Sequence, residues 1–211
     1  MGDGRCHTCR DFEPEFARAV SFGEYEGELR GLIHLLKYEA VFPVVQPLGS
    51  MTAHAIEDLL HSCGDAAPLV VAVPLHQSKR GARHFNQSEL IARAALKHLS
   101  KRLELASGVL VRRRATVSQV GLTREERVEN MRDAFRVEDR QRVQGRTVIV
   151  VDDVMTTGTT LSECARVLKK AGAEKVLAAT VARAFHDAVT SGDANHGEEE
   201  ASEAVEVAAS V

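Results

Sequence analysis

The sequence has no tryptophan, and aromatic residues make up only 4% of its 211 residues. A folded domain of this size must therefore build its core mainly from aliphatic side chains and alanine. No apolar run approaches the roughly 18 residues that cross a bilayer, and no apolar signal region opens the chain, so we expect a cytoplasmic protein without a membrane span. The formal net charge of -3 lacks the overall basic excess that is typical of nucleic-acid-binding proteins.

Cysteine is also scarce, and its four residues form no disulfide framework. Cys63 and Cys164 stand alone in apolar helical patterns and are expected to be small core residues. Cys6 and Cys9 form a Cys-x-x-Cys pair, but two thiolates do not complete a tetrahedral zinc site, and His7 is poorly placed to join them. A partial Zn²⁺ site completed from elsewhere, and a pair that binds no metal, both stay open.

The chain is predicted to hold one α/β domain over residues 25–185. Apolar runs without polar alternation predict buried parallel strands at 69–73, 147–151 and 176–181, with weaker strand candidates at 109–111 and 135–137. Apolar spacing predicts helices from residue 28 onward and over 48–60, 87–103, 124–131 and 159–170. Strands that alternate with helices predict a central, mostly parallel sheet flanked by helices.

The flanking segments differ from this domain. Residues 1–24 are polar and expected to be irregular, and Pro43 and Pro47 are expected to break the chain between the first two helices. Residues 186–211 are acidic and lack aromatic residues, which predicts a disordered tail.

The most informative segment, residues 148–160, reads Val-Ile-Val-Val-Asp-Asp-Val-Met-Thr-Thr-Gly-Thr-Thr. A buried strand delivers Asp152 and Asp153 to its carboxyl end, where open α/β sheets bind ligands. The turn and helix N-terminus that follow offer N–H groups and hydroxyls to a phosphate, and Gly158 lets the backbone come close. Because the carboxylates suit the vicinal hydroxyls of a ribose, the segment is expected to hold a ribose 5-phosphate at both ends.

Parts of this segment also occur in other classes of protein. An Asp-Asp pair after a strand also occurs in receiver domains and nucleotide hydrolases, and Thr-Gly-Thr-Thr could simply cap a helix. A receiver normally carries its acidic pair near the domain start, and the Gly-x-x-x-x-Gly-Lys-Ser/Thr motif of P-loop hydrolases is absent. The whole segment resembles the signature of type I phosphoribosyltransferases for 5-phosphoribosyl-1-pyrophosphate (PRPP). That resemblance implies PRPP binding by Asp152, Asp153, Met155, Thr156, Thr157, Gly158, Thr159 and Thr160.

Three further blocks are similar to the ComF family, whose members have this fold and are associated with DNA uptake in competence. They are Leu36-Lys37-Tyr38, residues 73–90, and residues 119–130 with the pattern Gln-x-x-Leu-x-x-x-x-Arg-x-x-Asn, and together they cover about residues 25–184. His84 stands where the family usually has glycine. The family usually carries two Cys-x-x-Cys pairs in an N-terminal zinc module, so residues 1–24 resemble a remnant of that module.

The resemblance also implies a mechanism. Pyrophosphate would leave the anomeric carbon of PRPP with the help of Mg²⁺, and the catalytic residues would be Asp152, Asp153 and Arg127. The pyrophosphate loop would comprise Leu75, His76, Lys79, Arg80 and Arg83. The basic run 112–114 fits either a hood over the leaving group or a solvated surface. Thr156 stands where 6-oxopurine phosphoribosyltransferases typically have an aspartate base, which disfavours purine salvage.

No residue identifies the acceptor of such a transfer. The rival hypothesis is a non-catalytic regulator that binds PRPP or a nucleotide, or a competence accessory protein. Contacts with competence machinery or single-stranded DNA, and a homodimer, also stay open.

Overall fold

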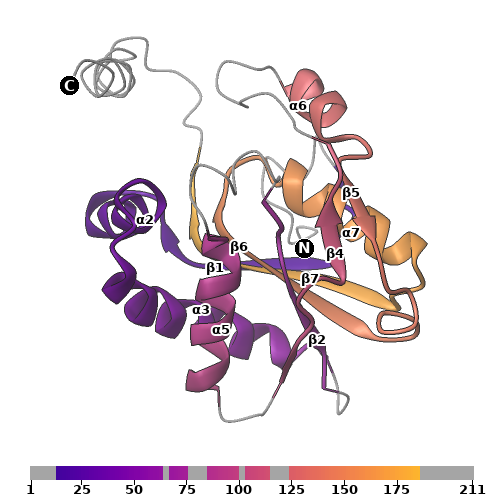
Figure 1. The fold of residues 1–211 in the computed structure, drawn as a ribbon, viewed down its shortest axis with the longest axis horizontal. Coiled ribbons are helices and arrows are strands. Elements are labelled where there is room, and N and C mark those ends of the chain that lie inside the picture. Colours follow the sequence, from indigo (N-terminus) through magenta and orange to yellow (C-terminus); the bar gives the residue numbers. More distant parts are fainter. Residues whose placement is uncertain (1–12, 64–66, 76–84, 100–102, 115–123, 186–211) are drawn as a thin grey trace, which may run out of the picture.

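The computed structural model describes residues 13–63, 67–75, 85–99, 103–114 and 124–185. At its centre lies a parallel sheet in the order β1-β7-β6-β2-β3 (Figure 1). The strands are β1 (Arg18–Glu24), β2 (Leu69–Ala72), β3 (Glu104–Leu105), β6 (Thr147–Met155) and β7 (Lys175–Arg183).

Helices and a small second sheet cover the two faces of the parallel sheet (Figure 1). On one side lie α2 (Gly27–Glu39), η1 (Phe42–Val44), α3 (Val45–Leu60) and α5 (Gln87–His98). On the other side lie α6 (Arg124–Met131), α7 (Thr159–Lys170) and the antiparallel pair β4 (Leu110–Arg112) and β5 (Phe135–Val137). The predicted α/β fold with a central parallel sheet is confirmed.

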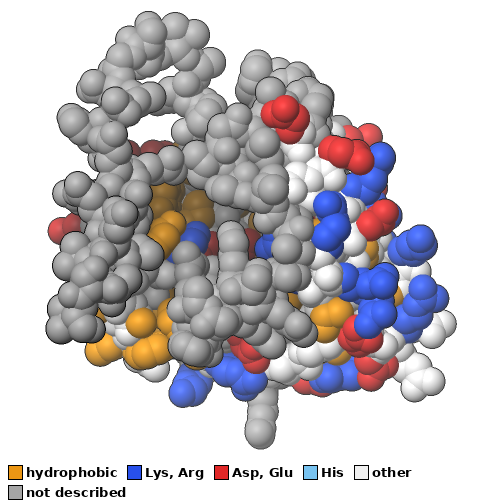
Figure 2. All heavy atoms as spheres, turned by 45° about the horizontal axis from the view of Figure 1, so that its top comes forward, with side chains coloured by type: hydrophobic (Ala, Val, Ile, Leu, Met, Phe, Trp, Pro, Cys, Tyr) orange, Lys and Arg blue, Asp and Glu red, His pale blue; other side chains and the backbone are white. Residues whose placement is uncertain are grey.

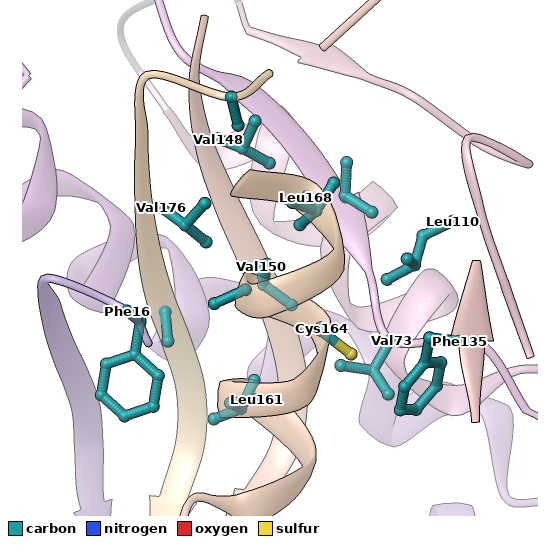
Figure 3. Close-up of a cluster of buried hydrophobic side chains, with 14 of the residues drawn as sticks. Phe16, Val73, Leu110, Phe135, Val148, Val150, Leu161, Cys164, Leu168 and Val176 are labelled. Carbon is teal, nitrogen blue, oxygen red and sulfur yellow. The ribbon is translucent and has the colours of Figure 1, made fainter. Parts of the chain in front are cut away.

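The core is aliphatic, as the scarcity of aromatic residues requires. Between the sheet and α7, strand residues such as Val148 and Val150 pack against Leu161, Cys164 and Leu168 (Figure 3). On the opposite face, Ile149 and Val151 pack against residues of α3 and α5. This alternation along β6 shows that the strand is buried on both sides.

The N-terminal segment differs from its prediction. Residues 1–24 were expected to be irregular, but Arg18–Glu24 form β1, the edge strand that pairs with β7. Its side chains are half-buried or exposed, and the Ser21 hydroxyl lies 2.6 Å from the Thr180 hydroxyl. An edge strand with one solvent-exposed face carries polar residues there, so it lacks the continuous apolar run of a central strand.

Several element bounds differ from their predictions, among them the end of the helix predicted over 87–103, which stops at His98. Two of these differences have a clear physical reason. Helix α3 begins at Val45, before Pro47, because a proline in the first turn gives up no intrahelical hydrogen bond. Strand β6 continues past Val151 to Met155, with Asp152 opposite Thr180 and Val154 opposite Ala182 in the ladder with β7. The acidic pair therefore belongs to a strand, whose backbone is held by hydrogen bonds.

Helices α3 and α5 approach each other closely at Gly49. A Cβ atom on Gly49 would collide with the Ala94 Cβ and would lie 3.0 Å from the Ala94 carbonyl carbon and the Ala95 nitrogen. Backbone atoms of a helix cannot move aside as the end of a flexible side chain can. The contact therefore requires glycine at this position.

We expect Gly49→Ala to lower the free energy of unfolding by about 1–3 kcal/mol, or roughly 2–10 °C in Tm, because the helices must separate. Gly31→Ala in α2 is the matched control, since nothing lies within 4 Å of a Cβ atom there. It should be neutral or raise the stability by up to about 1 kcal/mol. Thermal unfolding of both variants tests this, and a G49A variant as stable as the parent would contradict it.

Candidate active site at the carboxyl end of β6

The candidate site lies where β6 ends and α7 begins. Since the strands of the main sheet run parallel, their carboxyl ends meet at one edge, the usual ligand site of such sheets. A short turn joins β6 to α7. At its end Gly158 has φ 77°, a left-handed backbone conformation that residues with a side chain rarely adopt. The first turn of α7 contains no acidic residue.

A small hollow joins this turn to one carboxylate. It is lined by Asp152, Val154, Met155, Thr156, Thr157, Gly158, Thr159, Thr160 and Leu161. The hydroxyls of Thr157 and Thr159 lie 2.8 Å apart. Hydroxyls and the N–H groups of a helix N-terminus are suitable partners for a phosphate. The structure thus brings together seven of the eight residues that the sequence assigned to one ligand, and Asp153 is absent from this hollow.

Strand alternation explains why the two carboxylates separate. Successive side chains of a β-strand point to opposite faces, so Asp152 follows Val150 toward the α7 side, and Asp153 follows Val151 toward α5 and α2. Asp153 is 4% exposed. Its Oδ1 accepts a 2.7 Å hydrogen bond from the Val154 N–H, and its Oδ2 accepts one of 3.2 Å from Gln87 Nε2.

Asp153 also forms an ion pair with the first helix. Lys37 Nζ of α2 lies 3.3 Å from Asp153 Oδ2, and both side chains are largely withdrawn from solvent. The charge of Asp153 raises the pKa of Lys37. Three elements, α2, α5 and β6, thus meet at one carboxylate.

Asp152 has a different environment. Its Oδ1 accepts hydrogen bonds from Ser88 Oγ at 2.7 Å and from the Asp153 N–H at 2.9 Å. Loss of hydration and the negative charge of Asp153 raise the pKa of Asp152 to about 7. At neutral pH this carboxyl group therefore lies close to its protonation midpoint.

The basic run 112–114 contacts its own domain. The Arg112 guanidinium lies over the Phe135 ring, 5.4 Å from the centroid, and burial lowers the pKa of Arg112. Arg114 Nη2 donates to the carbonyl oxygens of Asn130 and Arg132 at 2.9 and 3.0 Å. Figure 2 shows the Lys and Arg side chains of the described surface interspersed with Asp and Glu on the visible face. No broad patch of one sign appears among the coloured side chains of that view.

The structure describes only some of the other predicted site residues. Leu75 lines a cavity of about 150 Å³ together with Pro74, Glu89 and Arg112. Cys6, Cys9, His76, Lys79, Arg80 and Arg83 lie outside the described residues. Arg127 lies in α6, but its side chain is also outside what the structure describes. Within the described ranges, no group of three or more His, Cys, Asp or Glu side chains could hold a metal ion.

Sequence reasoning gave no site role to Lys37, Gln87 or Ser88. One signal could have identified Lys37: it follows Ile33 by four residues and Leu36 by one, which places it beside the buried face of α2. A lysine in such a position is rarely buried unless it is paired.

The chain is similar in sequence to a known protein family and to named proteins. The family profile described as "Phosphoribosyl transferase domain" matches residues 86–207. DNA utilization protein YhgH of Escherichia coli K12 is 34% identical over 172 residues, which are 81% of this chain and 74% of that protein. Competence protein F of Haemophilus influenzae is 30% identical over 183 residues, 85% of this chain and 78% of that protein. The chain belongs to the ComF family of phosphoribosyltransferase-domain proteins.

A solved structure aligns with the chain only weakly. A hypoxanthine phosphoribosyltransferase from Staphylococcus aureus aligns with 68% of this chain and 73% of its own, with a TM-score of 0.41 and 13% identity. The ComF assignment rests on the sequence relatives. None of the described helices combines the length and apolarity that a membrane crossing requires.

The raised pKa of Asp152 predicts that the unliganded protein loses stability as pH rises. The folded state holds a proton that the unfolded chain releases near pH 3.8, so each step toward pH 7 costs folding free energy. Asp152→Asn keeps an oxygen acceptor for Ser88 and removes the charge. We expect it to stabilise the protein at pH 8 by on the order of 2 kcal/mol, roughly 4–8 °C in Tm, and to have little effect at pH 4.

Thermal unfolding between pH 4 and 8 checks this expectation. Asp58→Asn is the control, because Asp58 is an exposed carboxylate that pairs with Arg18 on the surface. It should follow the pH trend of the parent protein. A difference between D152N and the parent that stays constant with pH would show that Asp152 does not titrate as described.

Proposed function

We propose that the protein binds PRPP with Mg²⁺ at the carboxyl edge of β6 and transfers its 5-phosphoribosyl group to an acceptor, with loss of pyrophosphate. One observation carries the proposal: Asp152 and the Thr156–Thr160 turn line the same hollow. The turn suits the doubly charged 5-phosphate through N–H groups, hydroxyls and the positive end of the α7 dipole. The carboxylate suits the ribose hydroxyls, which are donors that a phosphate site cannot satisfy.

The chemistry follows from that placement. An acceptor atom bearing a lone pair forms a bond to the anomeric carbon, while the bond from that carbon to pyrophosphate oxygen breaks and pyrophosphate leaves with the electron pair. Positive charge develops on the ribose ring in the transition state. Once ribose hydroxyl donors stabilise its ionised form, the Asp152 carboxylate would stabilise this positive charge more strongly than it stabilises the ground state.

Pyrophosphate would leave toward β2, the neighbour of β6 in the sheet. The Val73 N–H donates to the Val151 carbonyl at 2.9 Å, so the chain that leads to Leu75 starts beside the acidic pair. The side chains of Lys79, Arg80, Arg83 and Arg127 are the proposed cationic partners of the departing charge. The carboxylate oxygens of this edge are hard donors of the type that Mg²⁺ accepts, and a bound Mg²⁺ would supply positive charge that neutralises the leaving group.

The names of two relatives suggest a context. Since those relatives are called a DNA utilization protein and a competence protein, we propose that the chain acts in the use or uptake of DNA. The acceptor would then be a component of that process, and Thr156 disfavours a 6-oxopurine acceptor that needs a carboxylate base. A partial zinc site at Cys6 and Cys9 is retained as a proposal that metal analysis of the purified chain would test.

We expect PRPP with Mg²⁺ to raise the Tm of the protein, because a ligand that binds only the folded state stabilises it. Asp152→Asn should weaken PRPP binding roughly 10–100-fold, the usual cost of losing charge-assisted hydrogen bonds. Thermal unfolding with and without PRPP and Mg²⁺ measures the first effect, and calorimetric titration with PRPP and Mg²⁺ measures the second, with Asp58→Asn as the control. Unchanged affinity in D152N would remove the ribose role of that carboxylate.

Turnover is tested separately from binding. Release of pyrophosphate from PRPP should occur with one member of a panel of bases and amines, and D152N should lower the rate at saturating PRPP at least as much as it lowers affinity. Phosphate detection after pyrophosphatase treatment gives the rate. Tight PRPP binding without release by any acceptor would instead support the non-catalytic regulator.

A further inference from the structure

The ion pair between Lys37 and Asp153 separates the roles of two carboxylates that are adjacent in sequence. Lys37 Nζ lies 3.3 Å from Asp153 Oδ2, with the Asp153 side chain 6% exposed. Gln87 Nε2 contacts the same oxygen and the Val154 N–H contacts the other. Every one of these donors comes from the chain itself, so Asp153 is already satisfied without a ligand.

Release of Asp153 toward a ligand would be costly. If its carboxylate turned to meet a ribose hydroxyl, the largely desolvated ammonium group of Lys37 and the buried amide of Gln87 would lose their partner. Breaking one half of a buried pair is strongly destabilising, because the remaining charge is poorly solvated. A neutral hydroxyl donor offers less in exchange than an ammonium group does.

Asp152 differs from Asp153 both in its hydrogen bonds and in its position at the hollow. Both hydrogen bonds that the structure gives its side chain fall on Oδ1, and the residue lines the hollow of the Thr156–Thr160 turn. Ser88 and the Asp153 N–H fix the orientation of the carboxylate. Gln87 and Ser88 are consecutive on α5, so the same helix turn holds Asp153 inward and Asp152 at the hollow.

We propose that Lys37 is a positioning residue of the phosphoribosyl site: its pair with Asp153 withholds that carboxylate from the ligand and leaves Asp152 as the one that receives the ribose hydroxyls. The inference rests on the proposed function, that PRPP binds at this edge. It assigns the two aspartates different tasks and gives α2, the first helix of the domain, a direct effect on the ligand site.

A double-mutant cycle on PRPP affinity tests the proposal. Lys37→Met, Asp153→Asn and the double variant should each weaken binding by a similar, modest factor of roughly 3–10, because the two residues act as a unit. Lys37→Arg should retain most of the parent protein's affinity for PRPP, since arginine keeps the positive charge. Lys37→Met combined with Asp152→Asn should instead show losses that multiply. Lys169→Met, which removes an exposed lysine paired with Glu15, is the control and should bind PRPP as the parent does.

Unfolding of the unliganded variants provides a second readout. Lys37→Met should lower the Tm by roughly 5–10 °C, and adding Asp153→Asn should recover much of that loss, since it removes the stranded charge. If D153N weakens PRPP binding as severely as D152N, and its loss multiplies with that of K37M, then Asp153 contacts the ribose itself and the proposal is overturned. Absence of PRPP binding by the parent protein would overturn the proposed function as well, and is seen without any variant.

Discussion

The site depends on the position of β6 within the sheet. This strand is hydrogen-bonded to β2 on one side and β7 on the other, and apolar clusters cover both of its faces. A polar side chain between Val148 and Val151 would be buried without a partner, at a cost of about 2–7 kcal/mol. The first polar side chains after this apolar run are therefore Asp152 and Asp153, near the carboxyl end of the strand.

The same strand also makes the site rigid. The ladder with β7 continues to Met155, so Asp152 and Asp153 sit on hydrogen-bonded backbone. Sites on regular elements hold their geometry better than sites on loops. The turn begins only at Thr156, after the last residue of the strand. Rigid carboxylates followed by a tight turn are a suitable arrangement for a ligand that has hydroxyls at one end and a phosphate at the other.

The sequence predicted the features that depend on local composition. Continuous apolar runs identified β2, β6 and β7, and the Asp-Asp and Thr-Gly-Thr-Thr segments identified the edge that forms the hollow. Strand β1 escaped because an edge strand with polar side chains resembles a loop. Its assignment depends on its pairing with β7, which is a tertiary property.

The placement of the two carboxylates on opposite faces of β6 could not be predicted in the same way. Alternation separates Asp152 from Asp153 only if β6 extends past Val151, and the apolar pattern ends there. The extension depends on β7, which offers a partner as far as Arg183. Lys37 belongs to a block that resembles the ComF family, but its partner lies on a distant strand, and only the folded chain brings the two residues together.

These contacts give the two acidic residues opposite energetics. Asp153 is buried and paired with Lys37 and Gln87, so its contribution is to hold α2 and α5 against the end of β6. Asp152 is incompletely compensated, and its raised pKa records that the unliganded fold disfavours its charge. A ligand that brings hydroxyl donors to Asp152 supplies what the chain withholds. Part of the intrinsic binding energy is then used to stabilise a charge that the fold alone leaves unfavourable. A carboxylate that already accepts hydrogen bonds from a lysine and an amide, as Asp153 does, gains little from such a ligand. Two aspartates that are adjacent in sequence therefore need not make equivalent contacts with one ligand.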